Sequence, residues 1–411
     1  MFSIFSLTAQ RTSKTIDEES KVPKYILPKL LKSDSGKKIQ NPIEWERIRR
    51  PEILEHFASQ MYGRIPGTLP SPEVRTLEEA TLAIEDKAIR KQIQLAFKNG
   101  SDSICMNILI YTPNKKLKAP VFLGYNFAGN YLLHKDPFIL IDGKKESELT
   151  GDSYKKFNVK KRGERTSRWA IEKIIESGYG LVTLNYNDVD RDKNDFSDGI
   201  HSLLYKSDQI KPEDDQWGSI SAWAWGMSRV MDYLEKETLI DEKKVILFGH
   251  SRLGKTSLWA GALDQRFSMV ISNNSGCGGA ALSRRRFGEK VSDITKNWSH
   301  WFAKNFQKYS ENESSLPIDQ HMLISLIAPR PVYVASASKD SWADPRGEFI
   351  SAKQASKVYK LYGMQGIELY DYPKVNTPIH QRIGYHLRDG KHDVTNYDWI
   401  QYIKFANMHI N

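Results

Sequence analysis

The sequence is poor in cysteine, in long apolar runs and in paired histidines. Only two of its 411 residues are cysteines, which excludes a disulfide scaffold and a multi-cysteine zinc site. No apolar stretch approaches the roughly 18 residues that a membrane span needs, so no membrane partner is predicted. The ten histidines form no H-x-x-x-H or H-E-x-x-H pair, so the sequence predicts no zinc site.

Positive charge is in excess, but it is spread along the chain. Sixty Lys and Arg against fifty Asp and Glu give a net charge of +10. The short basic clusters at 160–162 and 284–286 are not part of a basic block with interleaved aromatic residues, so nucleic acid is not predicted as a partner. Diffuse positive charge of this kind can steer a polyanionic substrate toward the protein.

Short buried strands alternate with helices through most of the chain. We expect strands at 89–97, 103–111, 121–125, 180–186, 245–248, 268–272, 331–337 and 367–370, and helices beginning near 41 and covering 165–177, 217–236, 253–263, 352–362 and 394–409. This alternation is typical of an α/β protein, a three-layer αβα sandwich with a mostly parallel central sheet.

The chain reads as one domain behind a short polar start. Met1 to Gln10 combines an apolar stretch with small and polar residues, which resembles the tail of a secretory signal. The stretch lacks a basic beginning and its apolar core is short, so a plain cytoplasmic terminus stays open as the alternative. With no internal repeat and no long linker, we expect a flexible N-terminus over 1–23 and a single domain over 24–411.

The segment 245–255 is the sharpest local feature, because a buried strand leads through Gly249 and Ser251 into a helix. This order is typical of a nucleophile elbow, in which a serine sits on the tight strand-to-helix turn of an α/β-hydrolase. The pattern places a second glycine two residues after the serine, but here that residue is Leu253, and Gly254 follows it. Taken alone, the segment leaves open an ordinary turn in which Ser251 caps the helix.

Two later residues occupy the positions that an elbow predicts. In this fold an acid and then a histidine follow the serine in chain order. Asp340 comes just after the strand expected at 331–337, and His392 lies in a glycine-containing loop before the last helix. A serine hydroxyl is a weak nucleophile that needs a histidine to take its proton and a carboxylate to orient that histidine. The order of the three residues therefore favours a catalytic triad.

A phosphate-binding loop is the rival interpretation of the same segment. Four residues separate Gly249 from the run 254–256, Gly-Lys-Thr, so the G-x-x-x-x-G-K-T pattern is formally matched. The acidic residues that could hold magnesium at a strand end, Asp188 and Asp190, precede this loop, whereas the metal-binding aspartate normally follows it. Their order argues against a nucleotide-binding protein.

Two basic residues accompany the candidate nucleophile. The backbone N–H of Arg252 is the usual oxyanion donor of such a turn, and its guanidinium can add a charged donor. Arginine at a helix N-terminus is disfavoured by the helix dipole, which favours a functional role over a structural one. Lys255 lies one helical turn after Ser251, where it could hold a hydroxyl or carboxyl-derived group of a substrate; a solvated lysine is the alternative.

Several further short segments share a pattern with one known family. They are 62–66, 126–130, 249–255, 275–279, 285–289, 319–321, 328–332, 340–345 and 390–395. From about Trp45 onward the chain resembles the glucuronoyl esterases, carbohydrate esterase family fifteen, in their bacterial form. The match to a phosphate-binding loop is accidental under this resemblance.

The resemblance implies an α/β-hydrolase that needs no cofactor. Its expected reaction is hydrolysis of the ester between (4-O-methyl-)glucuronic acid of glucuronoxylan and lignin alcohols, through a covalent glucuronoyl-enzyme. It implies Ser251 as nucleophile, His392 as base and Arg252 as the residue that stabilises the oxyanion. The substrate-binding positions that it implies are Lys255, Glu289 and Trp342, with Gln320 and His321 in a segment near the pocket. A polymeric substrate implies a secreted or periplasmic protein, and we expect a monomer.

The acid of the triad departs from the commonest family pattern. Many members carry a glutamate after the strand that follows the nucleophile helix, but the corresponding residues 272–275 contain no carboxylate. Asp340 matches the other acid position of the family, with Asn274 as a neutral substitute at the vacated site and Asp344 as a fallback. An acetylxylan esterase or general carboxylesterase on the same fold remains the alternative function, because fold does not fix function. The sequence leaves open whether the two cysteines pair.

Overall fold

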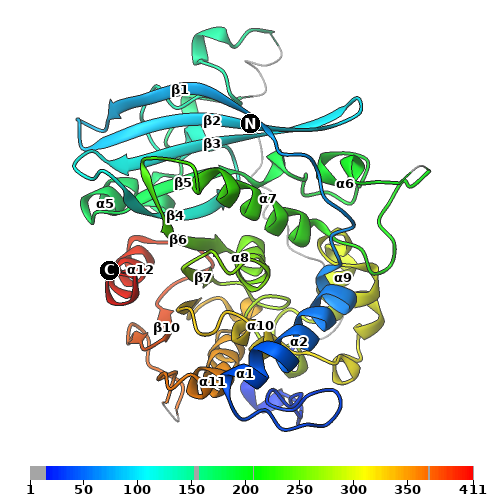
Figure 1. Cartoon of the computed structure of the whole chain (residues 1–411). Coiled ribbons are helices and arrows are strands. Elements are labelled where there is room, and N and C mark those ends of the chain that lie inside the picture. The colour runs from blue at the N-terminus through cyan, green and yellow to red at the C-terminus, as the bar shows by residue number, and fades with distance from the viewer. Residues whose placement is uncertain (1–14, 152–156, 207, 369–370, 411) are drawn as a thin grey trace.

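A computed structural model describes residues 15–151, 157–206, 208–368 and 371–410, and these residues build a single twisted sheet (Figure 1). The sheet has ten strands in the order β1-β2-β3-β5-β4-β6-β7-β8-β10-β9. Their bounds are β1 (Glu73–Ala83), β2 (Ala88–Asn99), β3 (Asp102–Pro113), β4 (Ala119–Asn126), β5 (Gly180–Asn185), β6 (Ile240–His250), β7 (Met269–Asn273), β8 (Val332–Ala337), β9 (Ile379–His380) and β10 (Ile383–Arg388).

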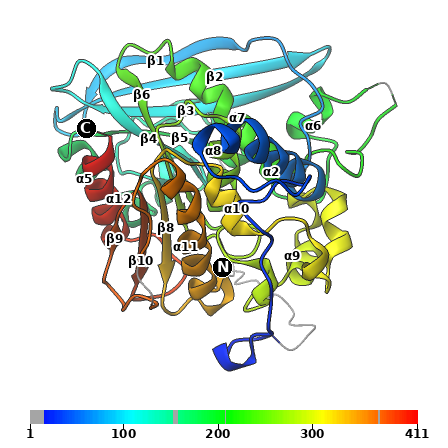
Figure 2. The same cartoon turned by 60° about the horizontal axis from the view of Figure 1, so that its bottom comes forward.

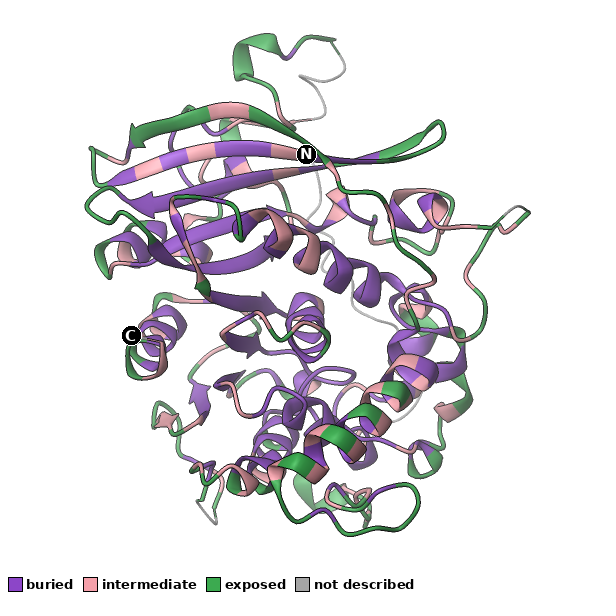
Figure 3. Cartoon of the chain, in the orientation of Figure 1, coloured by how far each residue is buried: buried purple, intermediate pink, exposed green. Residues whose placement is uncertain are grey.

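The middle of the sheet is parallel and its two ends are antiparallel. Strands β5, β4, β6, β7, β8 and β10 run parallel to one another. The pairs β1–β2, β2–β3, β3–β5 and β10–β9 are antiparallel. All residues of β4, β7 and β8 are buried, whereas β1 is largely exposed at the sheet edge (Figure 3). The six parallel strands therefore form the covered core of the sheet.

Helices cover both faces of this core (Figures 1 and 2). They are α1 (Pro42–Glu44), α2 (Arg50–Phe57), α4 (Thr166–Trp169), α5 (Ile171–Glu176), α6 (Gly199–Leu203), α7 (Ser219–Leu234), α8 (Arg252–Leu263), α9 (Val291–Asn297), α10 (Gln320–Ser325), α11 (Pro345–Leu361) and α12 (Asn396–His409). Side chains of α2, α7, α8, α10 and α11 belong to one hydrophobic cluster, and those of α5 and α12 belong to a second.

Alternation along the strands assigns each cluster to one face of the sheet. In β6, Val245 and Leu247 join the first cluster, whereas Ile246 and Phe248 join the second. Successive side chains of a strand point to opposite faces, so the two clusters are the two layers between sheet and helices. The αβα sandwich predicted from the sequence is confirmed, and it is the α/β-hydrolase architecture.

Several elements differ from their expected bounds. The helix expected at 165–177 is broken, because Ala170 has a φ of 23° between α4 and α5. The helical segment near 41 runs past Pro51, which occupies the first turn of α2, where its missing N–H is tolerated. The strand expected at 367–370 is absent at 367–368, and residues 369–370 lie outside the described residues. Strands β1, β9 and β10 were not expected.

Residues 15–23, expected to be flexible, make specific contacts with the body of the protein. Ile16 forms a β-bridge with Phe287, and its carbonyl accepts a hydrogen bond of 2.7 Å from the Gly288 N–H. Glu19 forms an ion pair of 2.8 Å with the buried Arg285. The expectation for residues 1–14, including the signal-like stretch, lies outside the described residues. Across the described ranges, no helix has the length and apolar character to cross a membrane.

Candidate active site

Ser251 sits on a strained turn between β6 and α8. Its backbone angles, φ of 59° and ψ of −129°, lie outside the regions that residues with a side chain normally adopt. Helix α8 begins at the next residue. Such a conformation costs about 1–3 kcal/mol and persists where the surrounding structure imposes it. Its side chain makes no capping hydrogen bond to the helix, so the alternative of a plain helix cap is wrong. The geometry of the turn is that of a nucleophile elbow.

The missing second glycine of the elbow motif has a local explanation. A Cβ on Gly249 would lie 1.9 Å from the carbonyl oxygen of Leu253, so only glycine fits before the serine. On the other side of the turn, the close approach falls on Gly254, where a Cβ would lie 3.0 Å from Cβ of Ser275. The position that needs to be small is therefore one residue later than the motif places it.

His392 and Asp340 meet at the same edge of the sheet as Ser251. Nδ1 of His392 lies 2.6 Å from Oδ2 of Asp340, which is buried and also accepts a hydrogen bond of 2.8 Å from Asn274. The ring centre of His392 lies 4.5 Å from the ring centre of His250, the residue directly before Ser251. These residues follow β6, β7, β8 and β10, and the carboxyl ends of parallel strands share one edge of a sheet.

Arg252 is held by an acidic residue that the sequence analysis did not single out. Its Nη1 donates to Oδ2 of Asp192, and its guanidinium carbon lies 4.8 Å from the centre of the Trp301 ring. Asp192 also accepts hydrogen bonds from His300 at 2.9 Å, from the Trp301 indole at 2.7 Å and from the Tyr186 hydroxyl at 3.0 Å.

The donors around Asp192 keep its carboxylate charged. Desolvation by burial opposes this, but the hydrogen bonds and the Arg252 charge prevail and lower the pKa of Asp192 to about 2. The missed signal was the Asp-rich run 188–192 after β5, of which the sequence analysis considered only Asp188 and Asp190, as magnesium ligands. Strand β5 ends at the same edge as β6, and this neighbourhood was not visible in the sequence.

Lys255, Glu289 and Trp342 lie together beneath this edge. Nζ of Lys255 donates to the Ser275 carbonyl at 2.6 Å and lies 4.0 Å from Oε2 of Glu289. The backbone N–H of Glu289 donates to the Trp342 carbonyl at 2.9 Å. Desolvation lowers the pKa of Lys255 and raises the pKa of Glu289, since both groups are buried. The pair is a preformed polar group beside the serine turn.

Gln320 and His321 face other parts of the molecule. Gln320 is fully buried and donates to the Gly279 carbonyl at 2.6 Å, which supports the loop 275–279 from beneath. Nε2 of His321 lies 3.2 Å from the Pro28 carbonyl, in a cavity lined by residues 27–32 and by Lys357. Burial lowers the pKa of His321 to about 4. The structure does not bring these two side chains into the group around Ser251.

The remaining candidates also have defined places. Asp344, the fallback acid, pairs with Arg285 through a hydrogen bond of 2.8 Å, whereas His392 is bound by Asp340. Glu348 is fully buried and accepts hydrogen bonds from the N–H groups of Ser275 and Gly276 at 2.8 and 2.9 Å. Cys105 and Cys277 are both free, the first exposed and the second buried, so they do not pair.

Fold and site together define a hydrolase of the α/β class. The family model described as "Glucuronyl esterase, fungi" matches residues 166–363. A carbohydrate esterase named MZ0003, from an unknown prokaryotic organism, is 48% identical over 396 residues, which cover 96% of this chain and 91% of that protein.

Two solved structures match over nearly the whole chain. One, described as a promiscuous CE15 esterase from a marine bacterial metagenome, has a TM-score of 0.87 and 47% identity and covers 96% of this chain and 100% of its own. The other, a glucuronoyl esterase from Solibacter usitatus, has a TM-score of 0.88 and 42% identity, with coverages of 95% and 100%. The chain belongs to the glucuronoyl esterases of carbohydrate esterase family fifteen and is a carboxylic ester hydrolase.

Proposed function

We propose that this enzyme hydrolyses the ester between (4-O-methyl-)glucuronic acid of glucuronoxylan and lignin alcohols. The observation that carries the proposal is the hydrogen bond between His392 and Asp340 beside the strained Ser251 turn. The buried pair of Lys255 and Glu289 next to that turn supports a substrate with several hydroxyl groups, since both side chains can hydrogen-bond to a sugar ring.

The reaction proceeds in two steps through an acyl-enzyme. Ser251 Oγ attacks the C6 carbonyl of the uronate ester while Nε2 of His392 takes its proton. Asp340 holds Nδ1–H of His392 and stabilises the positive charge that forms on the ring. The alcohol leaves with the proton from His392. Water then attacks the glucuronoyl-Ser251 ester with His392 as base, which releases glucuronate and regenerates the serine hydroxyl.

Arg252 stabilises the tetrahedral oxyanion. Preorganised donors aimed at developing charge are worth most when they do not reorganise during the reaction. The Asp192 carboxylate and the ring of Trp301 fix the guanidinium beforehand, which supports this role. In the same arrangement, Nε of Arg252 is buried without a hydrogen-bond partner, so its N–H is free to donate a hydrogen bond to the substrate.

Lys255, Glu289 and Trp342 bind the glucuronate ring in this proposal. Lys255 and Glu289 contact ring hydroxyls, and the indole of Trp342 packs against the sugar. Gln320 acts on this pocket through the loop 275–279, because its side chain is fully buried and contacts the loop backbone. His321 binds substrate only if the polymer extends to the cavity beside residues 27–32.

The proposed polymeric substrate determines where the enzyme must act. Glucuronoxylan and lignin lie outside the cell, so we propose a secreted or periplasmic enzyme that acts as a monomer. A broader carboxylesterase activity, acetylxylan included, is the second candidate, and the relative described as promiscuous favours keeping it.

The test compares the parent enzyme with Ser251→Ala on benzyl glucuronate, on methyl 4-O-methylglucuronate and on acetylated xylan. We expect release of glucuronate by the parent and loss of activity by about 10³-fold or more in the variant. Lys255→Met serves as the substrate-pocket variant, for which KM for the glucuronate esters should rise while acetate release stays unchanged. Strong acetate release without uronate hydrolysis by the parent would contradict the glucuronoyl proposal and favour the broader esterase.

A further inference from the structure

His392 is held in place by its loop rather than by burial. Its side chain is 42% exposed, whereas the partner Asp340 is 6% exposed. A half-exposed imidazole on a loop has several accessible orientations, and one hydrogen bond to Asp340 does not fix the backbone that carries it. The geometry of the catalytic histidine therefore depends on what holds residues 389–393.

Arg388, the last residue of β10, donates hydrogen bonds to three backbone carbonyls of that loop. Its Nη1 donates to the Asp389 carbonyl at 3.0 Å, and its Nη2 donates to the carbonyls of Lys391 and Asp393, each at 2.9 Å. The last two residues are the immediate neighbours of His392. The planar guanidinium presents its donors in a fixed fork, so it sets the positions of these carbonyls relative to one another.

The glycine of the loop is explained by the same side chain. Gly390 has a φ of 125°, and a Cβ on it would lie 2.6 Å from Nη1 of Arg388. The loop thus wraps closely around the guanidinium. On its other side, the Gly390 carbonyl accepts a hydrogen bond of 2.8 Å from the N–H of Lys339, directly before Asp340. The loop of the base is joined in this way to the loop of the acid.

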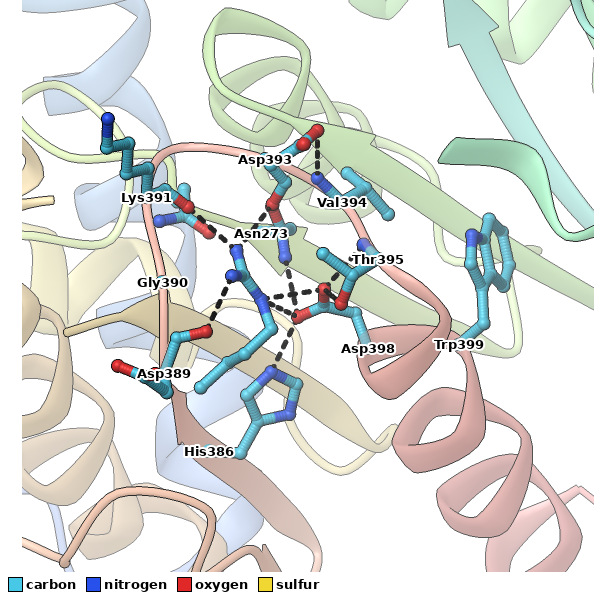
Figure 4. A network of polar contacts seen from close by, with 12 residues as sticks. Asn273, His386, Asp389, Gly390, Lys391, Asp393, Val394, Thr395, Asp398 and Trp399 are labelled. Atoms are coloured by element: carbon cyan, nitrogen blue, oxygen red, sulfur yellow. Dashed lines mark hydrogen bonds and ion pairs between the residues drawn. The ribbon is translucent and has the colours of Figure 1, made fainter. Parts of the chain in front are cut away.

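A buried carboxylate fixes the guanidinium in turn (Figure 4). Asp398, at the start of α12, is fully buried and lies 2.9 Å from Nε of Arg388. It also accepts hydrogen bonds from His386 at 2.8 Å and from the N–H and hydroxyl of Thr395, both at 2.7 Å. The carboxylate is saturated with donors and the Arg388 charge is balanced, as a buried ion pair requires.

A second connection runs from the same carboxylate to the ring of His392. Nδ2 of Asn273, at the end of β7, lies 3.4 Å from Asp398, and its Oδ1 lies 2.6 Å from Nδ1 of His250. His250 is buried and its ring lies 4.5 Å from that of His392. Asp398 is therefore linked to the backbone around His392 through Arg388, and to the ring of His392 through Asn273 and His250.

We propose that Arg388, fixed by Asp398, is a positioning residue for catalysis that holds the His392 loop in its reactive geometry. It touches neither substrate nor reacting atoms in this assignment. The proposal rests on the proposed role of His392 as the base. Displacing a catalytic group by about 1 Å can cost about 100-fold in rate, so loss of the fork should appear in kcat rather than in KM.

The test variant is Arg388→Lys, which keeps the positive charge for Asp398 but lacks the planar fork. The matched control is Arg382→Lys, which lies just before the other end of β10 and whose Nε donates to one carbonyl, that of Pro329, at 2.8 Å. Each protein is assayed on benzyl glucuronate for kcat and KM. Each is also assayed for the rate at which a fluorophosphonate phosphonylates Ser251, a reaction in which the serine displaces fluoride and His392 takes the serine proton.

We expect Arg388→Lys to lower kcat and the labelling rate together by about tenfold or more, with KM within about twofold of the parent. The control should leave all three unchanged. If Arg388→Lys proves unfolded by its thermal melting, Asp398→Asn provides the second variant and should show the same loss confined to kcat and labelling. Normal labelling and normal kcat in either folded variant would overturn the proposal.

The labelling readout separates this inference from the proposed substrate. A parent that is labelled at Ser251 but does not release glucuronate would contradict the substrate proposal, while the effect of Arg388→Lys on labelling would still decide the positioning role. A parent in which Ser251 is not labelled would overturn both.

Discussion

Asp192 holds the guanidinium of Arg252, the residue that we propose stabilises the oxyanion. Its carboxylate receives four donors, from Arg252, Tyr186, His300 and Trp301, and it is 8% exposed. Because its surroundings lower its pKa to about 2, the carboxylate is ionised at neutral pH. At that pH, its negative charge therefore balances the positive charge of Arg252.

We predict that Asp192→Asn lowers kcat/KM by about tenfold, because the amide cannot balance the Arg252 charge and its NH₂ group opposes the neighbouring donors. The matched control is Asp195→Asn, on the same loop, where the carboxylate is 41% exposed and pairs with Lys193. In the double variant with Arg252→Gln, the Asp192 change should add no further loss. Additive losses would contradict a role exerted through Arg252.

The protonation of Glu348 makes the stability of the folded protein depend on pH. Burial raises its pKa from 4.5 to about 8, and its two oxygens accept hydrogen bonds from Ser275, Gly276 and Ser336. Between these two pH values the folded protein keeps a proton that the unfolded chain has lost. The stabilising contribution of this group is thus full below about pH 4.5 and is lost as the pH rises through about 8.

We predict that Glu348→Gln reduces the loss of thermal stability between about pH 5 and about pH 9 by several degrees, because the amide mimics the protonated carboxyl. Melting temperatures of the parent and variant at both pH values measure the effect. Glu85→Gln, at a side chain that is 88% exposed, should leave the pH dependence unchanged. An identical pH dependence in Glu348→Gln and the parent would contradict the prediction.

Among the elements, the β6–α8 unit was the most predictable from sequence. Its apolar strand, its glycines and its helix start are local features, and they predicted the serine turn correctly. The positions of Asp340 and His392 followed from chain order, and the structure brings these two residues together. The partners of Arg252 and the surroundings of Gln320 depend on strand order and loop packing. Local sequence does not encode these, so Asp192 was missed.

Strand β10 was missed for a physical reason. Its residues 383–388 include glycine, histidine and arginine, which do not form the apolar run typical of a buried parallel strand. In the structure these polar side chains have partners, since His386 and Arg388 both bind Asp398. A polar strand can be buried when its side chains form a satisfied network.

We predict that Gly249→Ala destabilises the protein by about 3 kcal/mol or more, since the added Cβ would overlap the backbone of the turn. The obstacle is the Leu253 carbonyl, 1.9 Å away, and backbone cannot move aside as a flexible side chain can. Gly67→Ala is the control, because its nearest neighbour at 3.6 Å is the end of the Leu204 side chain. Urea unfolding compares the two variants. A loss at Gly249 no larger than that at Gly67 would contradict the assigned turn.

For the whole molecule, the continuous sheet from β1 to β9 argues for one unit. Its ten strands extend from residue 73 to residue 388, and both hydrophobic clusters draw side chains from early and late segments. We propose that residues 24–411 form a single catalytic domain. Residues 15–23 attach to it through Ile16 and Glu19, so the described part of the N-terminus is an arm on this domain.

The net charge of +10 predicts that the reaction on a charged polymer depends on salt. The uronate ester is neutral, but glucuronoxylan also carries free glucuronates, whose negative charges are attracted by a basic protein over distances that salt shortens. We therefore expect kcat/KM on glucuronoxylan–lignin ester fragments to fall severalfold between about 0.05 M and about 0.5 M NaCl.

The neutral substrate benzyl glucuronate provides the control within the same experiment, because it lacks the long-range attraction. Its kcat/KM should change by less than about twofold over the same salt range. Steering acts on the association of enzyme and polymer, so the loss on the polymer should lie in kcat/KM while kcat at saturation stays constant. Equal salt dependence of the two substrates would mean that salt acts on the catalytic site itself, which contains charged groups such as the Arg252–Asp192 pair.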